Sequence, residues 1–164
     1  MRNSPETHDL TINQDSKRIK KECLRLLTRR DHSRKEIQDK LTYKGFDRGQ
    51  VSEVIDELSG QNWQNDSRYA ESYARVRCQK GFGPVRIAYE LRQQGIEPEV
   101  VESALTAATN DWDSILEAVY FKKFPDNNRF DLNERGKRLR FLLQRGFSNG
   151  MINSLLDRQS KKST

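Results

Sequence analysis

Apolar residues recur at helical spacing from residue 17 onward, and the positions between them are mostly charged. The pattern predicts one helix beginning at Lys17, a second over residues 33–45 and a third over 47–60. Each helix has one apolar face and one polar face, so the three should pack around a shared small core. The residues expected to face inward are Ile19, Cys23, Leu26, Leu27, Ile37, Leu41, Val51, Val54, Ile55 and Leu58.

Helix start and stop signals support these boundaries. Ser33 precedes Glu36 by three residues, which is the spacing of a capping box, and Asp47 stands in the same relation to Gln50. Gly45 follows the second helix and can adopt the left-handed conformation of a helix C-cap. We therefore interpret Ser33 and Asp47 as helix caps and not as functional groups.

The same arrangement of helices repeats along the chain. A shift of about 50 residues places the apolar and turn positions of the first unit on those of a second, and a further shift of about 51 recovers two helices of a third. The pairs Gly45-Phe46, Gly95-Ile96 and Gly146-Phe147 mark the equivalent turns. Because each glycine follows a helix instead of opening one, we read these glycines as turn formers and not as a phosphate-binding site.

The third unit is expected to contain helices over residues 111–124 and 132–145, with a longer segment after Pro125. In the helix over 132–145, Leu139, Leu142 and Leu143 should point inward, which leaves Arg135, Arg138 and Arg145 toward solvent. The predicted domains are a mobile N-terminal tail over 1–16 and three-helix repeats over 17–62, 63–110 and 111–164. The predicted fold class is all-α, an elongated tandem array of three three-helix repeats of about 50 residues.

The composition predicts a small hydrophobic core and a basic surface. Of 164 residues, 34% are hydrophobic and 33% are charged, so little apolar surface is available for burial. The net charge is +6, and the excess lies in the first and third units. An anionic partner such as nucleic acid is favoured, although a solvated helix face explains any single basic run.

Several function classes have no support in the sequence. No apolar stretch is long enough to cross a membrane or to form a signal peptide, so we expect a cytoplasmic protein without membrane contact. Cys23 and Cys78, with only His8 and His32 beside them, do not match a zinc site and are expected to be reduced, buried thiols. The phosphate-binding, dinucleotide-binding and nucleophile motifs are absent, so we expect no metal, no cofactor and no catalytic residue.

Two pairs of residues are candidates for an acid and a base. Asp66 with Glu71, or His32 with Glu36, has the residue types of general acid-base catalysis. Asp66 begins a helix, however, and is better explained as a cap. The protein is therefore expected not to be an enzyme.

The aromatic residues divide into two groups. Tyr69, Tyr73, Phe46 and Phe147 lie at helical or post-cap spacing and are expected in the core. Phe82 lies instead in a loop between two glycines, where burial and contact with a partner are about equally favoured.

Four stretches together resemble the RecX proteins, bacterial regulators of the RecA recombinase. They are RRDHSRKEIQDKL at 29–41, NDSRYAESYARVR at 65–77, KGFGPVRIAYELRQQGI at 80–96 and KRLRFLLQRGF at 137–147. They occur in the family's order on a threefold helical repeat. Two residues depart from the family pattern: Gln64 stands where an apolar residue is usual, and Gln94 where a Lys is common.

The resemblance implies a protein that binds the RecA filament on single-stranded DNA. It would restrain filament extension, ATP hydrolysis, strand exchange and the stimulation of repressor self-cleavage in the SOS response. We expect a monomer that binds through its basic faces, with Phe82 as a loop contact. The basic residues assigned to the partner or to DNA are Lys17, Lys21, Arg25, Arg29, Arg75, Arg86, Arg135, Arg138 and Arg145.

The main alternative is a protein that binds DNA directly. Helix-turn-helix modules also join short helices through turns that contain glycine. None of the second helices carries the cluster of Asn, Gln and Arg on one face that base recognition usually needs. The filament regulator is therefore the preferred interpretation.

Overall fold

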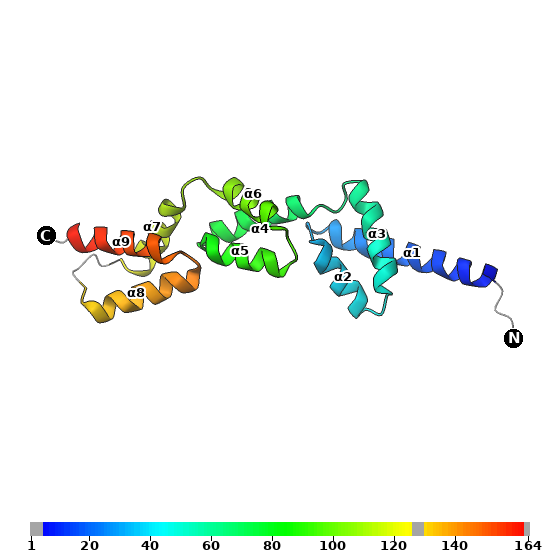
Figure 1. Cartoon of the computed structure of the whole chain (residues 1–164), viewed down its shortest axis with the longest axis horizontal. Helices are drawn as coiled ribbons and strands as arrows, with labels where there is room; N and C mark the ends of the chain where they lie inside the picture. The colour runs from blue at the N-terminus through cyan, green and yellow to red at the C-terminus, as the bar shows by residue number, and fades with distance from the viewer. Residues whose placement is uncertain (1–4, 126–129, 163–164) are drawn as a thin grey trace. The chain divides into compact units, whose positions relative to one another are not determined.

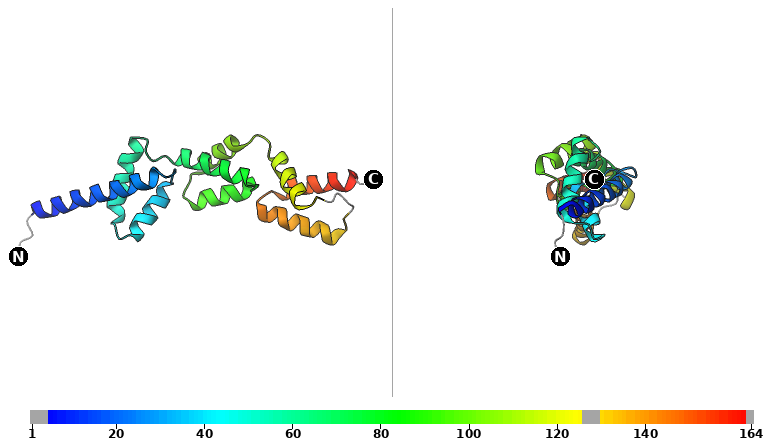
Figure 2. Two further views of the ribbon diagram at one scale, coloured as in Figure 1. Left: turned by 180° about the vertical axis from the view of Figure 1, so that it is seen from behind. Right: turned by 90° about the vertical axis from the view of Figure 1, so that its right-hand side faces the viewer.

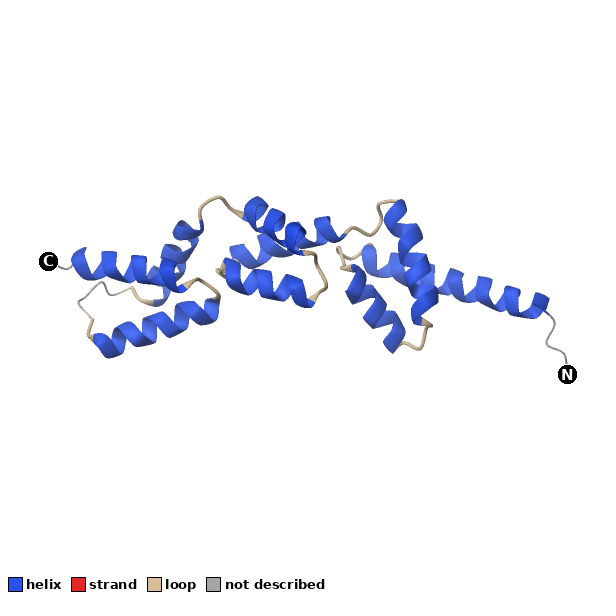
Figure 3. Ribbon diagram, in the orientation of Figure 1, coloured by secondary structure: helices blue, strands red, loops and turns tan. Residues whose placement is uncertain are grey.

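A computed structural model describes residues 5–125 and 130–162, and these residues form helices joined by short loops, with no strand among them (Figures 1 and 3). The all-α fold is therefore confirmed. The helices within the described ranges are α1 (Pro5–Leu27), α2 (Arg34–Tyr43), α3 (Arg48–Gly60), α4 (Asp66–Gln79), α5 (Pro84–Gln93), α6 (Pro98–Ala108), α7 (Trp112–Lys123), α8 (Leu132–Arg145) and α9 (Asn149–Lys162).

The chain divides into two compact units. The first unit comprises residues 1–70 and 94–96, and so contains α1, α2, α3 and the start of α4. The second unit comprises residues 71–93 and 97–164, with the rest of α4 and helices α5 to α9. The second and third repeats of the sequence thus share one compact unit, which the repeat pattern alone did not indicate.

In the first unit, α1 packs against α2 and α3 around a small apolar core. Capping fixes where two of these helices begin. The Ser33 hydroxyl accepts a hydrogen bond from the Glu36 backbone N–H at 3.0 Å, and the Asp47 carboxylate accepts one from the Gln50 N–H at 3.0 Å. Both predicted caps are confirmed. The buried core residues are Ile19, Cys23, Ile37, Leu41, Val51, Val54, Ile55 and Leu58.

In the second unit, α5 packs against α6, and α8 lies beside α9 (Figures 1 and 2). Ile87, Leu91 and Val101 are buried in the α4 to α6 part, as the period predicts. The α7 to α9 part has its own core, and its buried residues are Leu116, Tyr120, Leu142, Phe147, Ile152, Leu155 and Leu156.

The turn from α8 to α9 depends on glycine. Gly146 ends α8 in the left-handed conformation, with φ of +95°, and its N–H is bonded to carbonyls of the last turn. A Cβ at Gly146 would lie 2.7 Å from the Arg86 backbone nitrogen, and one at Gly83 would lie 2.7 Å from the Phe147 nitrogen. The α4 to α5 turn and the α8 to α9 turn therefore approach too closely for any other residue at these two positions.

The structure differs from the sequence predictions at the N-terminus and at one position of α8. The tail predicted over 1–16 is helical from Pro5, although the N-terminal part of α1 extends beyond α2 and α3 (Figure 2); residues 1–4 lie outside the described residues. Pro is compatible with the first position of a helix, so it begins α1 instead of excluding one. Leu143, predicted to face the core, is 38% exposed.

Candidate partner-binding surface

Four of the predicted contact residues form a basic stripe along the C-terminal part of α1 and the turn that follows it. Lys17, Lys21 and Arg25 lie on the helix at four-residue intervals, about 6 Å per step, and Arg29 lies in the turn after Leu27; all four are exposed. Arg25 shares an ion pair with Glu22 at 3.1 Å. Within the described part of the chain, Lys17, Lys21 and Arg29 have no ion pair.

The other cations of this helix are compensated. Arg18 pairs with Asp15 at 3.2 Å, and Lys20 pairs with Glu57 of α3 at 2.5 Å. Exposed pairs of this kind contribute little stability, but they cancel charge locally. Positive charge in this part of the described chain therefore stays available to a partner mainly at Lys17 and Lys21 of α1 and at Arg29 of the turn that follows.

In the second unit, Arg75 is exposed and makes no ion pair with the described residues. Two other predicted contact residues, Arg86 and Arg145, instead make contacts within the protein. The side chains of Arg77, Arg86 and Arg145 surround the half-buried ring of Phe82, with their guanidinium carbons 3.7, 4.7 and 4.9 Å from the ring centroid. Cation–π contacts favour such positions. We call Phe82, Arg77, Arg86, Arg145 and Glu90 the Phe82 cluster.

Glu90 supplies the negative charge of this cluster. Its carboxylate accepts hydrogen bonds from Arg77 at 2.5 and 2.8 Å, from Arg86 at 3.0 Å and from the Tyr73 hydroxyl at 2.8 Å. Burial raises the pKa of Glu90, but these hydrogen bonds outweigh burial and leave the pKa lowered. Glu90 is thus held ionised beside two cationic neighbours, Arg77 and Arg86.

Backbone hydrogen bonds join the Phe82 cluster to the end of α8. The Gly83 N–H donates to the Arg145 carbonyl at 2.8 Å, and the Val85 N–H donates to the Gly146 carbonyl at 3.0 Å. The Arg86 guanidinium donates to the Gln144 carbonyl at 3.0 Å. Arg86, Arg145 and Phe82 therefore hold two turns of the second unit together, which favours packing over partner contact for Phe82.

In α8, Arg138 and Arg135 do not face solvent as predicted. Arg138 is only 6% exposed: its guanidinium donates to the Tyr120 hydroxyl at 2.5 Å and lies over the rings of Phe130 and Phe124. The expectation that Arg138 faces solvent is wrong, because aromatic residues outside α8 enclose it. Arg135 is half-buried and pairs with Asp157 of α9 at 2.8 Å.

Two sets of basic residues were not among the predicted contacts. Arg77 makes the shortest contact with Phe82, but only the fold shows that its side chain turns toward the loop. Lys122 and Lys123 are exposed and lie in the last turn of α7, where lysines are common because they complement the helix dipole. In the sequence, the adjacent pair of lysines was the only sign of a basic surface at this helix end.

One member of each candidate acid-base pair, Asp66 or His32, makes a hydrogen bond that holds the fold. Asn65, and not Asp66, caps α4 through the Arg68 N–H at 3.0 Å, so the predicted Asp66 cap is wrong. Asp66 instead accepts the Arg34 N–H at the start of α2 at 2.8 Å. His32 is buried, its Nδ1–H donates to the Arg30 carbonyl at 3.0 Å, and burial lowers its pKa.

Gln64, one of the departures from the family pattern, is also buried and hydrogen-bonded. Its amide accepts from the Ser59 hydroxyl at 2.7 Å and donates to Asp66 at 2.9 Å. The polar side chain is therefore accommodated at a position where an apolar one was expected. Cys23 and Cys78 are free and buried, as predicted, and burial raises the pKa of Cys23 to about 11.

Among residues 5–125 and 130–162, no group of three or more His, Cys, Asp or Glu side chains is placed to hold a metal ion. Over the same part of the chain, none of the helices combines the length and the apolar character needed to cross a membrane. The described surface carries more exposed cations than exposed carboxylates, and this excess suits an anionic partner.

The fold and this surface define an all-helical protein of tandem three-helix segments with unpaired basic side chains. The family models for the first, second and third three-helix domains of RecX match residues 20–58, 65–105 and 111–156. The chain therefore belongs to the RecX family.

Relatives and solved structures agree with this assignment. The "Regulatory protein RecX" of Legionella pneumophila (strain Corby) is 39% identical over 133 residues, 81% of this chain and 89% of the relative. That of Mannheimia succiniciproducens is 41% identical over 127 residues, 76% of this chain and 83% of the relative. A crystal structure of RecX from Lactobacillus salivarius has a TM-score of 0.72 at 27% identity, and covers 90% of this chain and 97% of its own. A second crystal structure, of regulatory protein RecX, has a TM-score of 0.80 at 22% identity, over 96% of this chain and 79% of that one. The chain is thus a member of a family of regulatory proteins.

Proposed function

We propose that this protein binds the RecA filament on single-stranded DNA and inhibits its extension, ATP hydrolysis, strand exchange and stimulation of repressor cleavage. Family membership across all three segments supports a regulatory role. The single observation that supports an anionic binding partner is a set of exposed cations that have no ion pair with the described residues, namely Lys17 and Lys21 of α1, Arg29 of the turn after α1, and Arg75 of α4.

The proposed action is binding, not catalysis. A filament carrying DNA presents regularly repeated phosphate charge, which exposed lysines and arginines attract by displacing counterions. Three three-helix segments on one monomeric chain can make several weak contacts, whose combined effect exceeds that of any single contact. A bound chain would block the addition of RecA protomers and the conformational cycle of those already present.

Exposure and internal contacts reduce the number of candidate contact residues. Lys17, Lys21, Arg25, Arg29 and Arg75 remain candidates for contact because they are exposed. Arg138 is removed because it is buried. Arg86, Arg135 and Arg145 act first as structural residues through their internal hydrogen bonds and ion pairs.

The α1 stripe gives a direct test. Replacing Lys17 and Lys21 by Glu should leave the helical circular-dichroism signal intact but weaken inhibition of RecA ATP hydrolysis on single-stranded DNA. The matched control replaces both by Arg, which keeps the charge and should keep inhibition. Wild-type inhibition should also decline as salt concentration rises. Equal inhibition by the Glu and Arg variants at low salt would exclude the stripe from binding.

A further inference from the structure

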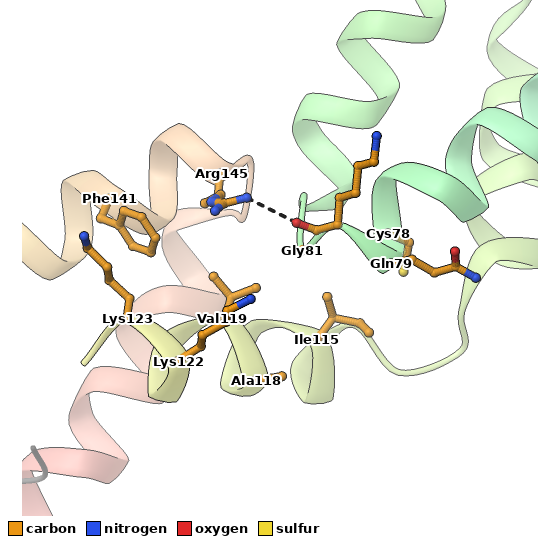
Figure 4. Close-up of a pocket in the computed structure, with 11 residues that line it drawn as sticks. Cys78, Gln79, Gly81, Ile115, Ala118, Val119, Lys122, Lys123, Phe141 and Arg145 are labelled. Carbon is orange, nitrogen blue, oxygen red and sulfur yellow. Dashed lines mark hydrogen bonds between the residues drawn. The ribbon is translucent and has the colours of Figure 1, made fainter. Parts of the chain in front are cut away.

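A pocket of about 430 Å³ lies in the second unit, between the end of α4 and helices α7 and α8 (Figure 4). Its size is within the range of pockets that accept a small ligand or a few side chains. Much of its lining is apolar or small, as Figure 4 shows, and these residues include Cys78, Ile115, Ala118, Val119 and Phe141.

The charged groups that line this pocket are all cations. They are Lys80, Lys122, Lys123 and Arg145, and no carboxylate lines the pocket. The three lysines are exposed and form no ion pair with residues of the described chain. Arg145 is held in place, because its guanidinium donates to the Lys80 carbonyl at 3.2 Å (Figure 4).

The helix C-termini near the pocket compensate only part of this positive charge. Helices α4, α7 and α8 end at Gln79, Lys123 and Arg145, so three helix C-termini lie near the pocket. Together they contribute about −1.5 elementary charges, against four cationic side chains. A positive excess remains, and an anionic ligand would neutralise it.

The aromatic residue in the pocket is poorly suited to stacking on a nucleic acid base. Phe141 is half-buried and packs edge-to-face on Phe124, with ring centroids 5.6 Å apart. The cationic groups of Lys123 and Arg145 both lie 5.6 Å from the Phe141 ring centroid. Single-stranded nucleic acid is usually bound through open aromatic faces, so an apolar side chain is the better occupant.

We propose that this pocket binds an acidic protein segment that inserts an apolar side chain between α7 and α8 while its carboxylates contact Lys80, Lys122 and Lys123. The apolar lining would desolvate the inserted side chain, and the lysines would select acidic flanking residues. This inference deepens the proposed function and rests on it, because it assigns the pocket to the protein component of the partner.

The test uses the full-length chain and a fluorescently labelled peptide in which Phe and Leu alternate with runs of Asp and Glu. Fluorescence anisotropy measures its affinity for the wild type and for three variants. The rim variant, Lys122→Glu with Lys123→Glu, reverses the charge of two lysines that line the pocket. Ala118→Phe fills the pocket at an exposed position without changing charge. Arg92→Glu with Arg140→Glu is the matched control, because both arginines are exposed, lie outside the pocket lining and change the net charge equally.

The rim variant and the filled pocket should each weaken peptide binding by about tenfold or more, whereas the control should stay within about twofold. A peptide with Ser in place of Phe and Leu should bind about tenfold more weakly than the original. Equal weakening by the two double reversals would overturn the proposal in favour of general charge attraction. Binding of a thymidine oligonucleotide that only the rim variant abolishes would also overturn it, by making the pocket a nucleic acid site.

Regulation of RecA is measured on the same samples. Absent peptide binding with intact inhibition by the wild type would overturn the pocket assignment and leave the proposed function standing. Pocket-dependent peptide binding without any effect of the wild type on RecA would instead contradict the proposed function.

Discussion

Reversing the charge of Arg138 should destabilise the second unit by about 3–5 kcal/mol, the usual effect of breaking a buried charged contact. Arg138 is 6% exposed, and its guanidinium lies 4.4 Å from the Phe130 ring centroid and 5.0 Å from that of Phe124. It also donates to the Tyr120 hydroxyl at 2.5 Å and to Glu134 at 3.3 Å. Arg138→Glu would place a carboxylate in this aromatic site and beside a second carboxylate.

The magnitude follows from these contacts. A hydrogen bond that involves a charged group contributes about 1.5–3 kcal/mol, and a desolvated cation–π contact about 2 kcal/mol. The contacts share one guanidinium, so their contributions overlap and do not add fully. The newly buried carboxylate adds repulsion from Glu134, which keeps the expected loss at the upper part of the range.

Urea denaturation followed by circular dichroism measures the effect, with Arg140→Glu as the matched control on the same helix. Arg140 is exposed, so its reversal should leave the unfolding midpoint nearly unchanged. A midpoint for Arg138→Glu equal to that of Arg140→Glu would show that the aromatic site around position 138 does not form.

Three further predictions concern the cores, a cap and a buried histidine. Leu91→Ala should destabilise the protein by about 2–4 kcal/mol in urea denaturation, because Leu91 is fully buried; an unchanged midpoint would contradict its place in the core. Ser33→Ala should cost about 1 kcal/mol and lower the melting temperature without reducing RecA inhibition per folded molecule; lost inhibition at full stability would assign Ser33 to binding. Burial lowers the pKa of His32 below its ordinary value of 6.5, so the unfolded chain binds the proton more tightly. Stability should therefore fall as pH drops from about 7.5 to about 5.5, and His32→Gln should remove that part of the pH dependence; an equal decline in the variant would exclude His32 as its source.

Local signals predicted most of the fold. Caps such as Ser33 and Asp47 depend on residues three positions away, and the buried faces of α2, α3 and α5 depend on spacing within one helix. The start of α1 could not be predicted in the same way, because its first turns lack an apolar periodicity. Leu143 fits the helical period of α8, yet it is 38% exposed, because the period alone does not tell which part of the apolar face a neighbouring element buries.

The candidate site was less predictable than the fold. The burial of Arg138 depends on Tyr120, Phe124 and Phe130, which precede α8 and meet the guanidinium only after folding. The position of Arg145 beside Phe82 likewise joins residues far apart in the sequence. Charge alone suggested that both arginines face a partner, whereas the three-dimensional contacts show that they stabilise the second unit.

The most direct test of the central claim is RecA ATP hydrolysis on single-stranded DNA, titrated with this protein in the presence and absence of excess naked single-stranded DNA. Binding to the filament predicts that inhibition is saturable and persists when naked DNA is in excess. Inhibition that disappears when naked DNA is added would contradict the account, because the protein would then compete for DNA instead of acting on the filament.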